Sequence, residues 1–436
     1  PGAFFLLSLH LSCGREKRAL QSIDIIICPT GSAGDHFPFI GLGQALLARG
    51  HRVTMVSNGY FQETIEAAGL EYVELATRDE FLQLANDPDL WSPFRGFPCI
   101  FRGLWPYIPR QYEYLRERRS DKNFVVIASS LSFGARIAQE SLRIPLVTVH
   151  LQPAVIWSGF QSPKFFGIWS GAWVPRWVRR WQYALGERLV IDRTACPDMN
   201  RFRSQLGLAP MRRLTSWWNS TDRIIGLFPP WYGPPQPDWP KQLRLTEFPL
   251  WEDAQDRPLG ADVERFLAEG EAPIVFTPGS AMMFGKSFFV ESARACQQLG
   301  RRGMLMTRFA DQIPAELPAG VRHFEYAPFS RLLRRAAAVV HHGGIGTTAQ
   351  ALASGVPQLI MPMSHDQPDN AHRVSQLGVA DWVSRRKYRA TNIVPKLQRL
   401  LTSHEVATSC RDVAHRFAGV DPFAKACELC EQVARV

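Results

Sequence analysis

The sequence predicts an α/β protein built from two doubly wound, Rossmann-like domains that face each other across a cleft. With 436 residues the chain is too long for one ordinary core, so two domains are expected. Each half also repeats short apolar runs that are followed by helical stretches or loops, the pattern of a parallel sheet covered by helices. The composition, 46% hydrophobic and 21% charged residues, excludes a disordered protein.

The first half begins with the segment SIDIIICPTGSAGDHFPFIGLGQALLARGHRVTMVSN. Residues 23–28 form an apolar run, a glycine-bearing loop follows, helical spacing continues to Gly50, and residues 52–56 are a second β-rich run. This order is typical of a parallel α/β unit, whose ligands bind beyond the carboxyl ends of the strands. The runs FVVIAS and PLVTVH predict further strands of the same sheet.

The second half repeats the pattern in APIVFTPGS, GMLMT, VRHFEYAP, AAVVHHGG and PQLIMPM. Between the halves, prolines and aromatic residues replace periodicity, which indicates a linker. We expect an N-terminal extension over residues 1–22, an N-terminal domain over 23–245, a linker over 246–260, a C-terminal domain over 261–410, and a helical tail over 411–436 that can pack back on the N-terminal domain.

The region from Pro153 to Trp218 concentrates Trp, Phe and Arg. Two interpretations are open. Its helices pack over the first sheet with their arginines directed outward, or the region forms an apolar acceptor pocket or a contact with a membrane surface. No run in it is long and uncharged enough to predict a transmembrane helix.

Charge and cysteine usage restrict the partners and the compartment. The formal charge of +10 favours an acidic partner such as a nucleotide, an anionic lipid surface or a nucleic acid. Nucleic acid is not expected, because the arginines are dispersed and accompany no binding module. The cysteines are scattered, which indicates a reducing, cytoplasmic compartment. Cys427 and Cys430 have zinc-like spacing but no second pair of ligands, so we interpret them as structural thiols.

The segment AAVVHHGGIGTT predicts a strand that enters a glycine-rich turn and then a helix. Free backbone N–H groups and the positive end of the helix make this turn favourable for phosphate. The next buried strand, GVPQLIMPM, ends at SHDQPDN, where Asp366 and Gln367 can bind sugar hydroxyls. The order along the chain is therefore phosphate first and sugar next.

This segment resembles the donor-binding signature of family 1 glycosyltransferases with the GT-B fold, and the resemblance runs from about Ile23 to Val433. The opening motif TGSAGDHFPFIGLGQALLARGHRV is similar to that of the bacterial members. Within the family, GSAGD-FPFIGLG, GARIA-E and GGIG are most similar to the rhamnosyltransferases of rhamnolipid synthesis. The resemblance implies inverting transfer, in which an acceptor hydroxyl attacks the anomeric carbon as a nucleoside diphosphate leaves.

The resemblance also implies where the catalytic base lies. Asp35 matches the base position, and His36 is its rival because imidazole has the better intrinsic pKa. The glycine loop around them contains Gly31, Ser32 and Gly34. Plant members pair a histidine base with an aspartate near the run that is here VVIASSLSFG, but this run has no carboxylate. A single carboxylate is therefore expected to act.

On the donor side, the resemblance assigns the β-phosphate to His342, with His341 as an open alternative. Tyr326 stands where the family stacks an aromatic ring on the nucleobase, and Phe329 replaces a glutamine of the base-binding motif. Gln350 replaces a glutamate that binds both ribose hydroxyls in uridine-selective members. The remaining expected donor residues are Thr277, Gly279, Ser280, Gly343, Gly344, Gly346, Thr347, Asp366, Gln367 and Asn370.

No metal or other cofactor is expected, because the helix terminus and the histidine take the place of a metal ion. The motif DPD at Asp87–Asp89 resembles a metal motif of the other glycosyltransferase fold and is interpreted as incidental. The expected partners are a nucleotide-sugar donor and a hydrophobic hydroxylated acceptor such as a hydroxy-fatty-acid derivative. The preferred donor is dTDP-rhamnose. A peripheral contact at the inner face of the membrane is compatible with such an acceptor. The alternatives are UDP-glucose transfer to a sterol or polyketide, and nucleotide-sugar epimerisation.

Overall fold

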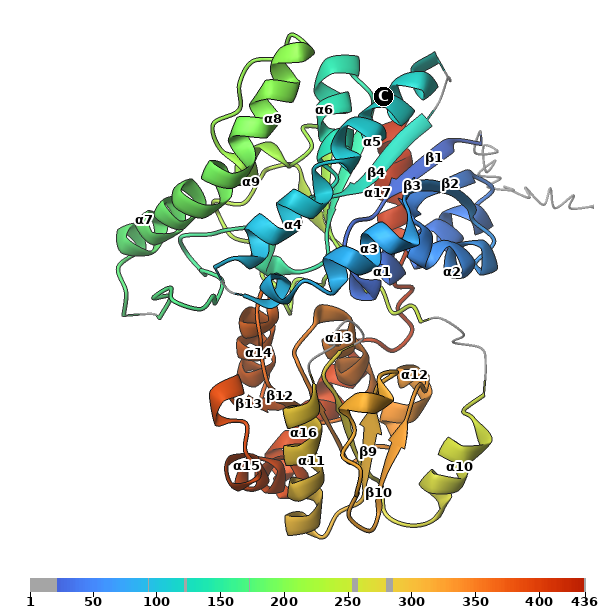
Figure 1. Ribbon diagram of the computed structural model, residues 1–436, viewed down its shortest axis with the longest axis vertical. Helices are drawn as coiled ribbons and strands as arrows, with labels where there is room; N and C mark the ends of the chain where they lie inside the picture. Colours follow the sequence, from blue (N-terminus) through green and yellow to red (C-terminus); the bar gives the residue numbers. More distant parts are fainter. Residues whose placement is uncertain are drawn as a thin grey trace, which may run out of the picture.

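The computed structural model describes residues 22–434 except 93, 121–123, 172, 253–257 and 280–284. Two α/β halves are stacked along the long axis of the molecule, each with a parallel sheet between helices (Figure 1). The predicted two-domain architecture is therefore confirmed. The expected extension lies outside the described residues except for its last residue, Ser22.

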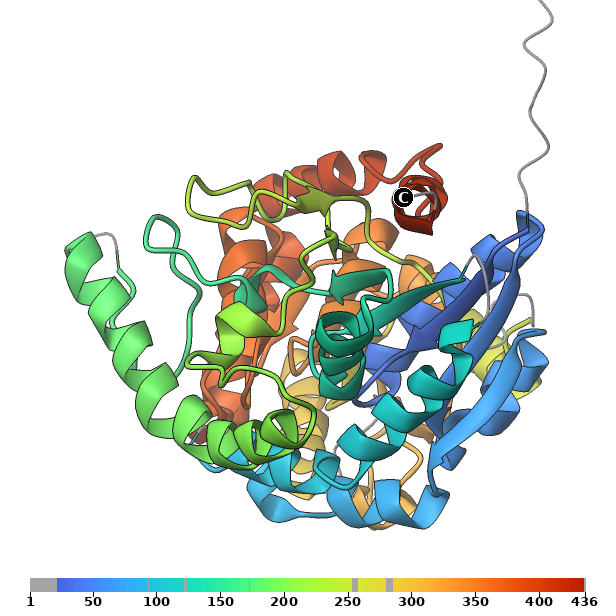
Figure 2. The same ribbon diagram turned by 90° about the horizontal axis from the view of Figure 1, so that it is seen from above.

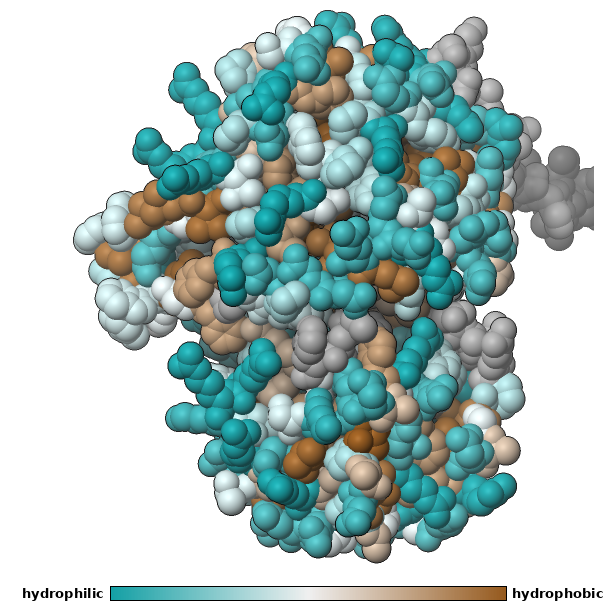
Figure 3. Space-filling view, viewed as in Figure 1, coloured by the Kyte–Doolittle hydropathy of each residue, from teal (hydrophilic) through white to brown (hydrophobic). Residues whose placement is uncertain are grey.

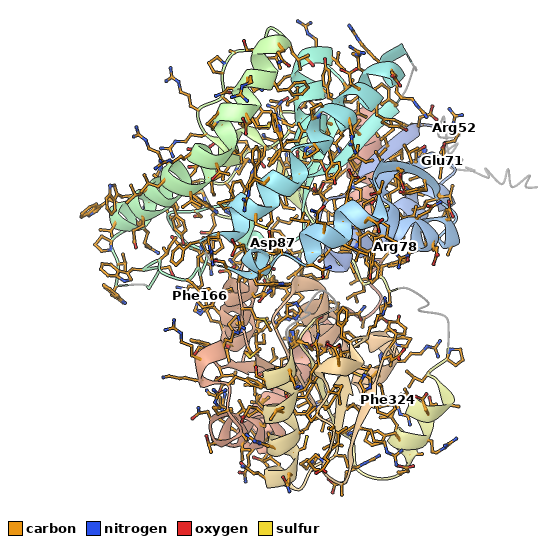
Figure 4. The ribbon with its side chains drawn as sticks, viewed as in Figure 1. Arg52, Glu71, Arg78, Asp87, Phe166 and Phe324 are labelled. Atoms are coloured by element: carbon orange, nitrogen blue, oxygen red, sulfur yellow. The ribbon has the colours of Figure 1, made fainter. Side chains whose placement is uncertain are left out.

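The N-terminal sheet has seven parallel strands in the order β3-β2-β1-β4-β5-β6-β7. From β1 to β3 the strands are added toward one edge of the sheet, and from β4 to β7 they are added toward the other. The switch point is therefore between β1 and β4, and ligands bind at such a point in open α/β sheets. Arg52 of β2 pairs with Asp24 of β1 at the start of the strands (Figure 4). The strands are β1 (Asp24–Cys28), β2 (Arg52–Asn58), β3 (Glu71–Ala76), β4 (Phe124–Ser129), β5 (Leu146–His150), β6 (Arg223–Gly226) and β7 (Leu243–Leu245).

Helices cover both faces of this sheet, so the central strands are almost wholly buried and apolar. The first helix after β1 begins with a capping box, because Ser32 is its N-cap residue and Asp35 stands three positions later. The helices are α1 (Ala33–Ala48), α2 (Gln62–Ala67), α3 (Arg78–Ala85), α4 (Gly96–Leu104), α5 (Tyr107–Glu117), α6 (Phe133–Leu142), α7 (Arg176–Gly186), α8 (Arg193–Gln205) and α9 (Leu214–Trp217).

The C-terminal sheet has six parallel strands in the order β10-β9-β8-β11-β12-β13, with its switch point between β8 and β11. Its strands are β8 (Ile274–Thr277), β9 (Gly303–Met306), β10 (Val321–Phe324), β11 (Ala338–His341), β12 (Gln358–Ile360) and β13 (Ala380–Trp382). The helices of this half are α10 (Ala261–Ala268), α11 (Lys286–Leu299), α12 (Phe329–Leu332), α13 (Ile345–Ser354), α14 (Gln367–Gln376), α15 (Ala390–Thr402) and α16 (His404–His415).

The last helix, α17 (Ala424–Ala434), lies against the N-terminal half, where its apolar face joins the core around α1 (Figure 1). Its Cys427 and Cys430 are buried free thiols in that core. Glu431 anchors the helix by an ion pair with Arg49 at 2.6 Å and a hydrogen bond with His51 at 3.0 Å. The predicted boundary at residue 410 falls inside α16, so the C-terminal domain extends through this helix before the chain returns.

The aromatic region divides between the two interpretations of its sequence. Trp217 and Trp218 are buried in the N-terminal core, as packing helices would require. Helix α7 behaves differently, because Trp177 and Trp181 are exposed at its surface. Seen from above, α7 and α8 run along one edge of the molecule (Figure 2). Within the described residues, no helix has the length and apolar character needed to cross a membrane.

Candidate active site

Asp35 lies in the first turn of α1, directly beyond the carboxyl end of β1 at the N-terminal switch point. Its Oδ2 accepts hydrogen bonds from the Ser32 backbone N–H at 2.8 Å and from the Ser32 hydroxyl at 3.1 Å. No hydrogen bond among the described residues reaches Oδ1, which is thus available to an acceptor hydroxyl. Burial raises the pKa of Asp35 above its ordinary value, although the Ser32 bonds oppose the shift. This makes the carboxylate a stronger base.

Gly31 sets the position of this carboxylate. Its φ of +132° disfavours any other residue, and a Cβ added here would lie 2.2 Å from the Asp35 Oδ2. We expect Gly31→Ala to displace the carboxylate and to lower turnover by about 10²-fold or more, the lower end of the usual cost of a lost general base. Steady-state kinetics measures the loss, and circular dichroism checks that the fold is kept.

Gly34 provides the matched control, because a Cβ added there meets nothing closer than 3.7 Å. Gly34→Ala in the same loop should retain turnover within about twofold, since an alanine in a helix is at least as favourable as glycine. Equal losses in the two variants would show that the loop tolerates no side chain at all, and would contradict a specific role for Gly31.

His36, the rival base, is fully buried, and both of its ring nitrogens are engaged. Nδ1 lies 3.0 Å from the Ser32 carbonyl and Nε2 lies 2.8 Å from the Ser57 hydroxyl, while the ring stacks on Phe61. Burial lowers the pKa of His36 to about 4. This enclosed, neutral ring holds α1 against β2, and its geometry favours Asp35 as the base.

His341 is the last residue of β11, and its side chain points into the interior. Its Nε2 lies 3.0 Å from the Gln358 side-chain oxygen, and its Nδ1 accepts the Gly343 backbone N–H at 3.1 Å. Burial lowers the pKa of His341 to about 4. Both nitrogens are therefore occupied by protein contacts that hold the glycine turn in place, and neither is free to bind a ligand.

His342 lies on the other side of the chain, between the two glycine loops of the C-terminal sheet. A Cβ on Gly279 or on Gly344 would lie 2.5 Å from its ring. Its Nδ1 is buried and has no hydrogen-bond partner among the described residues. Burial, followed by the proximity of His341, lowers the pKa of His342 to about 3. An anion in this place would supply the missing partner and favour the protonated ring.

The glycine loops that enclose His342 follow β8 and β11, the two strands of the C-terminal switch point. Gly279, with a φ of +100°, follows Thr277, whose hydroxyl accepts the Gly279 N–H at 3.3 Å. Gly344 is the N-cap of α13, so the free N–H groups of that helix open toward the loop. Gly346 and Thr347 lie in its first turn, and a Cβ at Gly346 would meet open space. Ser280 lies outside the described residues.

Asp366 and its neighbours lie beyond the end of β12, at the start of α14. Asp366 Oδ2 accepts the Asn370 amide at 2.6 Å, and the same amide donates to the Gly343 carbonyl at 2.9 Å. The Gln367 side-chain oxygen accepts the backbone N–H groups of Met363 and Ser364. The hydrogen bonds of Asn370 and Gln367 thus fix the shape of the loop, and the Asn370 amide also holds the Asp366 carboxylate in place.

Asp35 and Asp366 come from different halves and lie close enough to interact. Burial, and next the charge of Asp35, raise the pKa of Asp366 to about 7. The candidate base and the candidate sugar-binding carboxylate therefore share one site at the junction of the two sheets.

The expected nucleobase and ribose residues lie on the same half. Tyr326 follows β10, is 45% exposed, and has the Arg308 guanidinium 5.7 Å from its ring centre. Gln350 is a largely buried residue of α13. The backbone N–H of Phe329 donates to Glu252 of the linker, which also accepts the N–H of Ser330. The linker carboxylate thus caps α12 beside the predicted base site.

Tyr232, which the sequence did not indicate, joins the halves at the site. Its hydroxyl lies 2.8 Å from the Asn370 side-chain oxygen, and its carbonyl accepts Arg373 of α14 at 3.1 Å. Nearby, the Lys164 backbone N–H donates to Asp369 at 2.9 Å. These bonds fix α14, and with it Asp366, against the N-terminal half. The only signal in the sequence is a tyrosine between two pairs of prolines in PPWYGPP.

The DPD motif has a local structural role. Asp87 accepts the Asp89 backbone N–H at 2.8 Å and so caps the short turn Pro88–Trp91 near the junction of the halves (Figure 4). Within the described ranges, no three His, Cys, Asp or Glu side chains gather in a group that could hold a metal ion.

Known proteins resemble this chain in both halves. Residues 25–156 match the glycosyltransferase family 28 N-terminal domain, and residues 306–423 match the C-terminal domain of erythromycin biosynthesis protein CIII-like proteins. The chain is 29% identical over 431 residues to an O-mycaminosyltylonolide 6-deoxyallosyltransferase of Streptomyces fradiae, covering 94% of this chain and 97% of that protein. It is 25% identical to a sterol 3-beta-glucosyltransferase of Arabidopsis thaliana, covering 84% of this chain and 58% of that protein.

Among solved structures, the glycotransferase of kitacinnamycin superposes with a TM-score of 0.73 at 20% identity, covering 95% of this chain and all of that one. The fold is thus that of GT-B glycosyltransferases, and the family match of the first half and the full-length relative identify the chain as a glycosyltransferase. The matches of both halves support its placement among the family 1 glycosyltransferases.

Proposed function

We propose that the protein is an inverting, metal-independent glycosyltransferase that moves a hexose, rhamnose from dTDP-rhamnose in the first place, to a hydroxyl of a lipid-like acceptor such as a hydroxy-fatty-acid derivative. The observation that carries the proposal is that Asp366, whose pKa the charge of Asp35 helps to raise, is joined through Asn370 to the Gly343 turn beside His342. A base, a sugar-binding carboxylate and an anion-binding turn are the three parts that transfer from a nucleotide sugar requires.

In this proposal Asp35 takes the proton of the acceptor hydroxyl while the oxygen of that hydroxyl forms a bond to the anomeric carbon. The bond between that carbon and the diphosphate oxygen breaks on the opposite face, so the configuration inverts. The leaving diphosphate gains negative charge. The N–H groups at the start of α13 and the ring of His342, whose buried Nδ1 has no partner among the described residues, would stabilise it.

The choice of donor rests on Gln350 and on the relatives. A glutamate carboxylate accepts a strong, charge-assisted hydrogen bond from a ribose 2′-hydroxyl, and a neutral amide accepts only a weaker one. A donor with deoxyribose, which lacks that hydroxyl, therefore loses less binding energy with Gln350 than it would with a glutamate. The 6-deoxyallosyltransferase of Streptomyces fradiae is named for a 6-deoxyhexose, the chemical class of rhamnose. The second candidate is UDP-glucose with a sterol or polyketide acceptor, which the sterol glucosyltransferase relative and the Asp366–Gln367 pair favour.

The proposed acceptor follows from the aromatic residues between Pro153 and Trp218, a region whose Lys164 backbone N–H bonds to Asp369 of α14. Each buried CH₂ of an acyl chain would contribute about 0.8 kcal/mol to binding. Catalytic efficiency should therefore rise with the chain length of a hydroxyacyl acceptor until the apolar surface is filled.

A mass-spectrometric screen of hydroxylated lipids, sterols, polyketides and small phenols against several nucleotide sugars tests this proposal. We expect glycosides of hydroxyacyl acceptors, with dTDP-rhamnose used more efficiently than UDP-glucose. A clear preference for UDP-glucose would overturn the donor assignment, and a preference for small polar phenols would overturn the acceptor. Release of a free sugar epimer without any acceptor would instead identify an epimerase.

The raised pKa of Asp366 predicts how donor affinity depends on pH. The carboxylate form accepts sugar hydroxyls, so donor affinity should weaken as the pH falls through about 7, where Asp366 becomes protonated. Asp35→Asn removes the charge that raises this pKa, so the same transition should occur at lower pH in the variant. Titration calorimetry with the accepted donor between pH 5 and 9 measures both midpoints. An unchanged midpoint would contradict the interaction of the two carboxylates.

A further inference from the structure

Helix α7, the turn before it and the helical segment Glu187–Asp192 that continues it present an apolar stripe to solvent. Trp177, Trp181, Leu185 and Leu189 follow one another at four-residue intervals, and Trp173 precedes them by four. Residues with this spacing lie on one helix face. Their exposed fractions are 72, 59, 39 and 55%, and that of Trp173 is 78%. Large apolar residues that are exposed singly are common, but a continuous row indicates a contact surface.

The opposite face fixes the orientation of this stripe. Tyr183 is the one buried residue of α7, its hydroxyl donates to the Pro163 carbonyl, and its ring centre lies 5.0 Å from that of Trp157. The stripe therefore cannot turn inward without breaking this anchor. In the space-filling view, brown and near-white residues dominate the projecting end at the left, whereas teal residues cover much of the remaining face (Figure 3).

The charged side chains of α7 and of the chain that leads to it are all basic. Residues 151–186 contain no Asp or Glu. Glu187 and Asp192, which follow α7, are buried and directed inward to Arg213. In contrast, Arg176, Arg180 and Arg188 are exposed and have no ion-pair partner among the described residues. Arg179 is turned inward, where its guanidinium donates to the Phe160 carbonyl.

We propose that this surface, Trp173 to Leu189 with its arginines, binds an anionic lipid bilayer. Tryptophan favours the interface between water and lipid, and unpaired arginines beside an apolar stripe are attracted to anionic headgroups. A second copy of the chain fits less well. Two stripes in contact would bring both sets of unpaired guanidinium groups together, and residues 151–186 have no carboxylate to compensate them.

The stripe is joined to the active site by the loop before it. The Lys164 backbone N–H donates to Asp369 of α14, the helix that starts beside Asp366, and Phe166 lies at the lower edge of the N-terminal half (Figure 4). Docking by α7 would thus bring the junction of the halves close to a bilayer surface, where an amphiphilic acceptor resides. Binding itself requires neither donor nor acceptor, so it stands or fails separately from the proposed transfer.

Vesicle cosedimentation without substrates tests the proposal. The full chain should bind vesicles of phosphatidylcholine mixed with phosphatidylglycerol at least about tenfold more tightly than vesicles of phosphatidylcholine alone, since several basic residues each add to the attraction. The double variant Trp177→Ser/Trp181→Ser should lose about tenfold or more on the mixed vesicles. Arg176→Gln/Arg180→Gln should lose mainly the preference for the anionic lipid.

Trp382→Ser is the matched control, because Trp382 is 49% exposed and lies in β13 of the C-terminal half, outside the stripe. It should bind vesicles like the parent chain, and equal melting temperatures would show that all variants are folded. Absence of vesicle binding by the parent chain, or equal binding by the double tryptophan variant, would overturn the proposal. The proposal would also be overturned if light scattering showed that the parent chain is a dimer and the double tryptophan variant a monomer, while neither binds vesicles.

Discussion

Asp35→Asn should abolish most of the transfer activity and leave donor binding nearly intact. The amide keeps the shape of the side chain and one oxygen for the Ser32 bonds, but it cannot take the proton of the acceptor hydroxyl. Loss of a general base costs on the order of 10²- to 10⁴-fold in turnover. Steady-state kinetics with the accepted acceptor measures turnover, and titration calorimetry with the donor measures binding.

His36→Asn is the control for this experiment. An asparagine amide can replace Nδ1 in its contact with the Ser32 carbonyl, while the contact with Ser57 and the stacking on Phe61 are lost. We expect a less stable protein with turnover within about tenfold of the parent, because no proton transfer is removed. A severe loss of turnover in a folded His36→Asn variant, combined with a mild effect of Asp35→Asn, would reverse the assignment of the base.

His342→Ala should weaken donor binding by about 10- to 100-fold, because a hydrogen bond to a charged group contributes roughly 1.5–3 kcal/mol. The effect should appear with the free nucleoside diphosphate as well as with the nucleotide sugar, since the diphosphate is the part that we propose the ring contacts. Calorimetry with both ligands separates the phosphate contact from recognition of the sugar.

Two comparisons sharpen this result. His415→Ala changes an exposed histidine in the last turn of α16 and should leave donor binding unchanged. His341→Ala removes the support of the Gly343 N–H and should lower thermal stability as well as donor affinity. If His342→Ala bound the diphosphate like the parent chain, the anion site would have to lie elsewhere on the loop.

The local parts of the site are predictable from sequence because they depend on short spacings. The capping box of Ser32 and Asp35 starts α1 directly after a buried strand, and this alone places Asp35 at the edge of the sheet where ligands bind. The glycine turn after β11 is predictable for the same reason. Asp366 follows a buried strand and a proline-bounded turn. Its position at the carboxyl edge of the C-terminal sheet therefore also follows from the pattern.

Other features depend on contacts that no local pattern encodes. By residue type alone, His341 and His342 are equally suited to bind a phosphate. Side chains alternate at the end of β11, so His341 points inward to Gln358 and His342 lies beside the glycine loops. Tyr232 lies in a proline-rich stretch without periodicity, although it joins α14 to the other half. The outward direction of Trp177 is opposite to what its residue type predicts in a core helix.

The configuration of the product at its anomeric carbon tests the proposed mechanism most directly. Direct attack by a hydroxyl that Asp35 deprotonates inverts that centre in a single displacement, whereas a covalent sugar–enzyme intermediate would retain it. NMR of the glycoside formed from a donor of known configuration, recorded before any spontaneous equilibration, distinguishes the two. We predict the inverted glycoside as the initial product, and a product that retains the configuration of the donor would contradict the assignment of Asp35 as a general base.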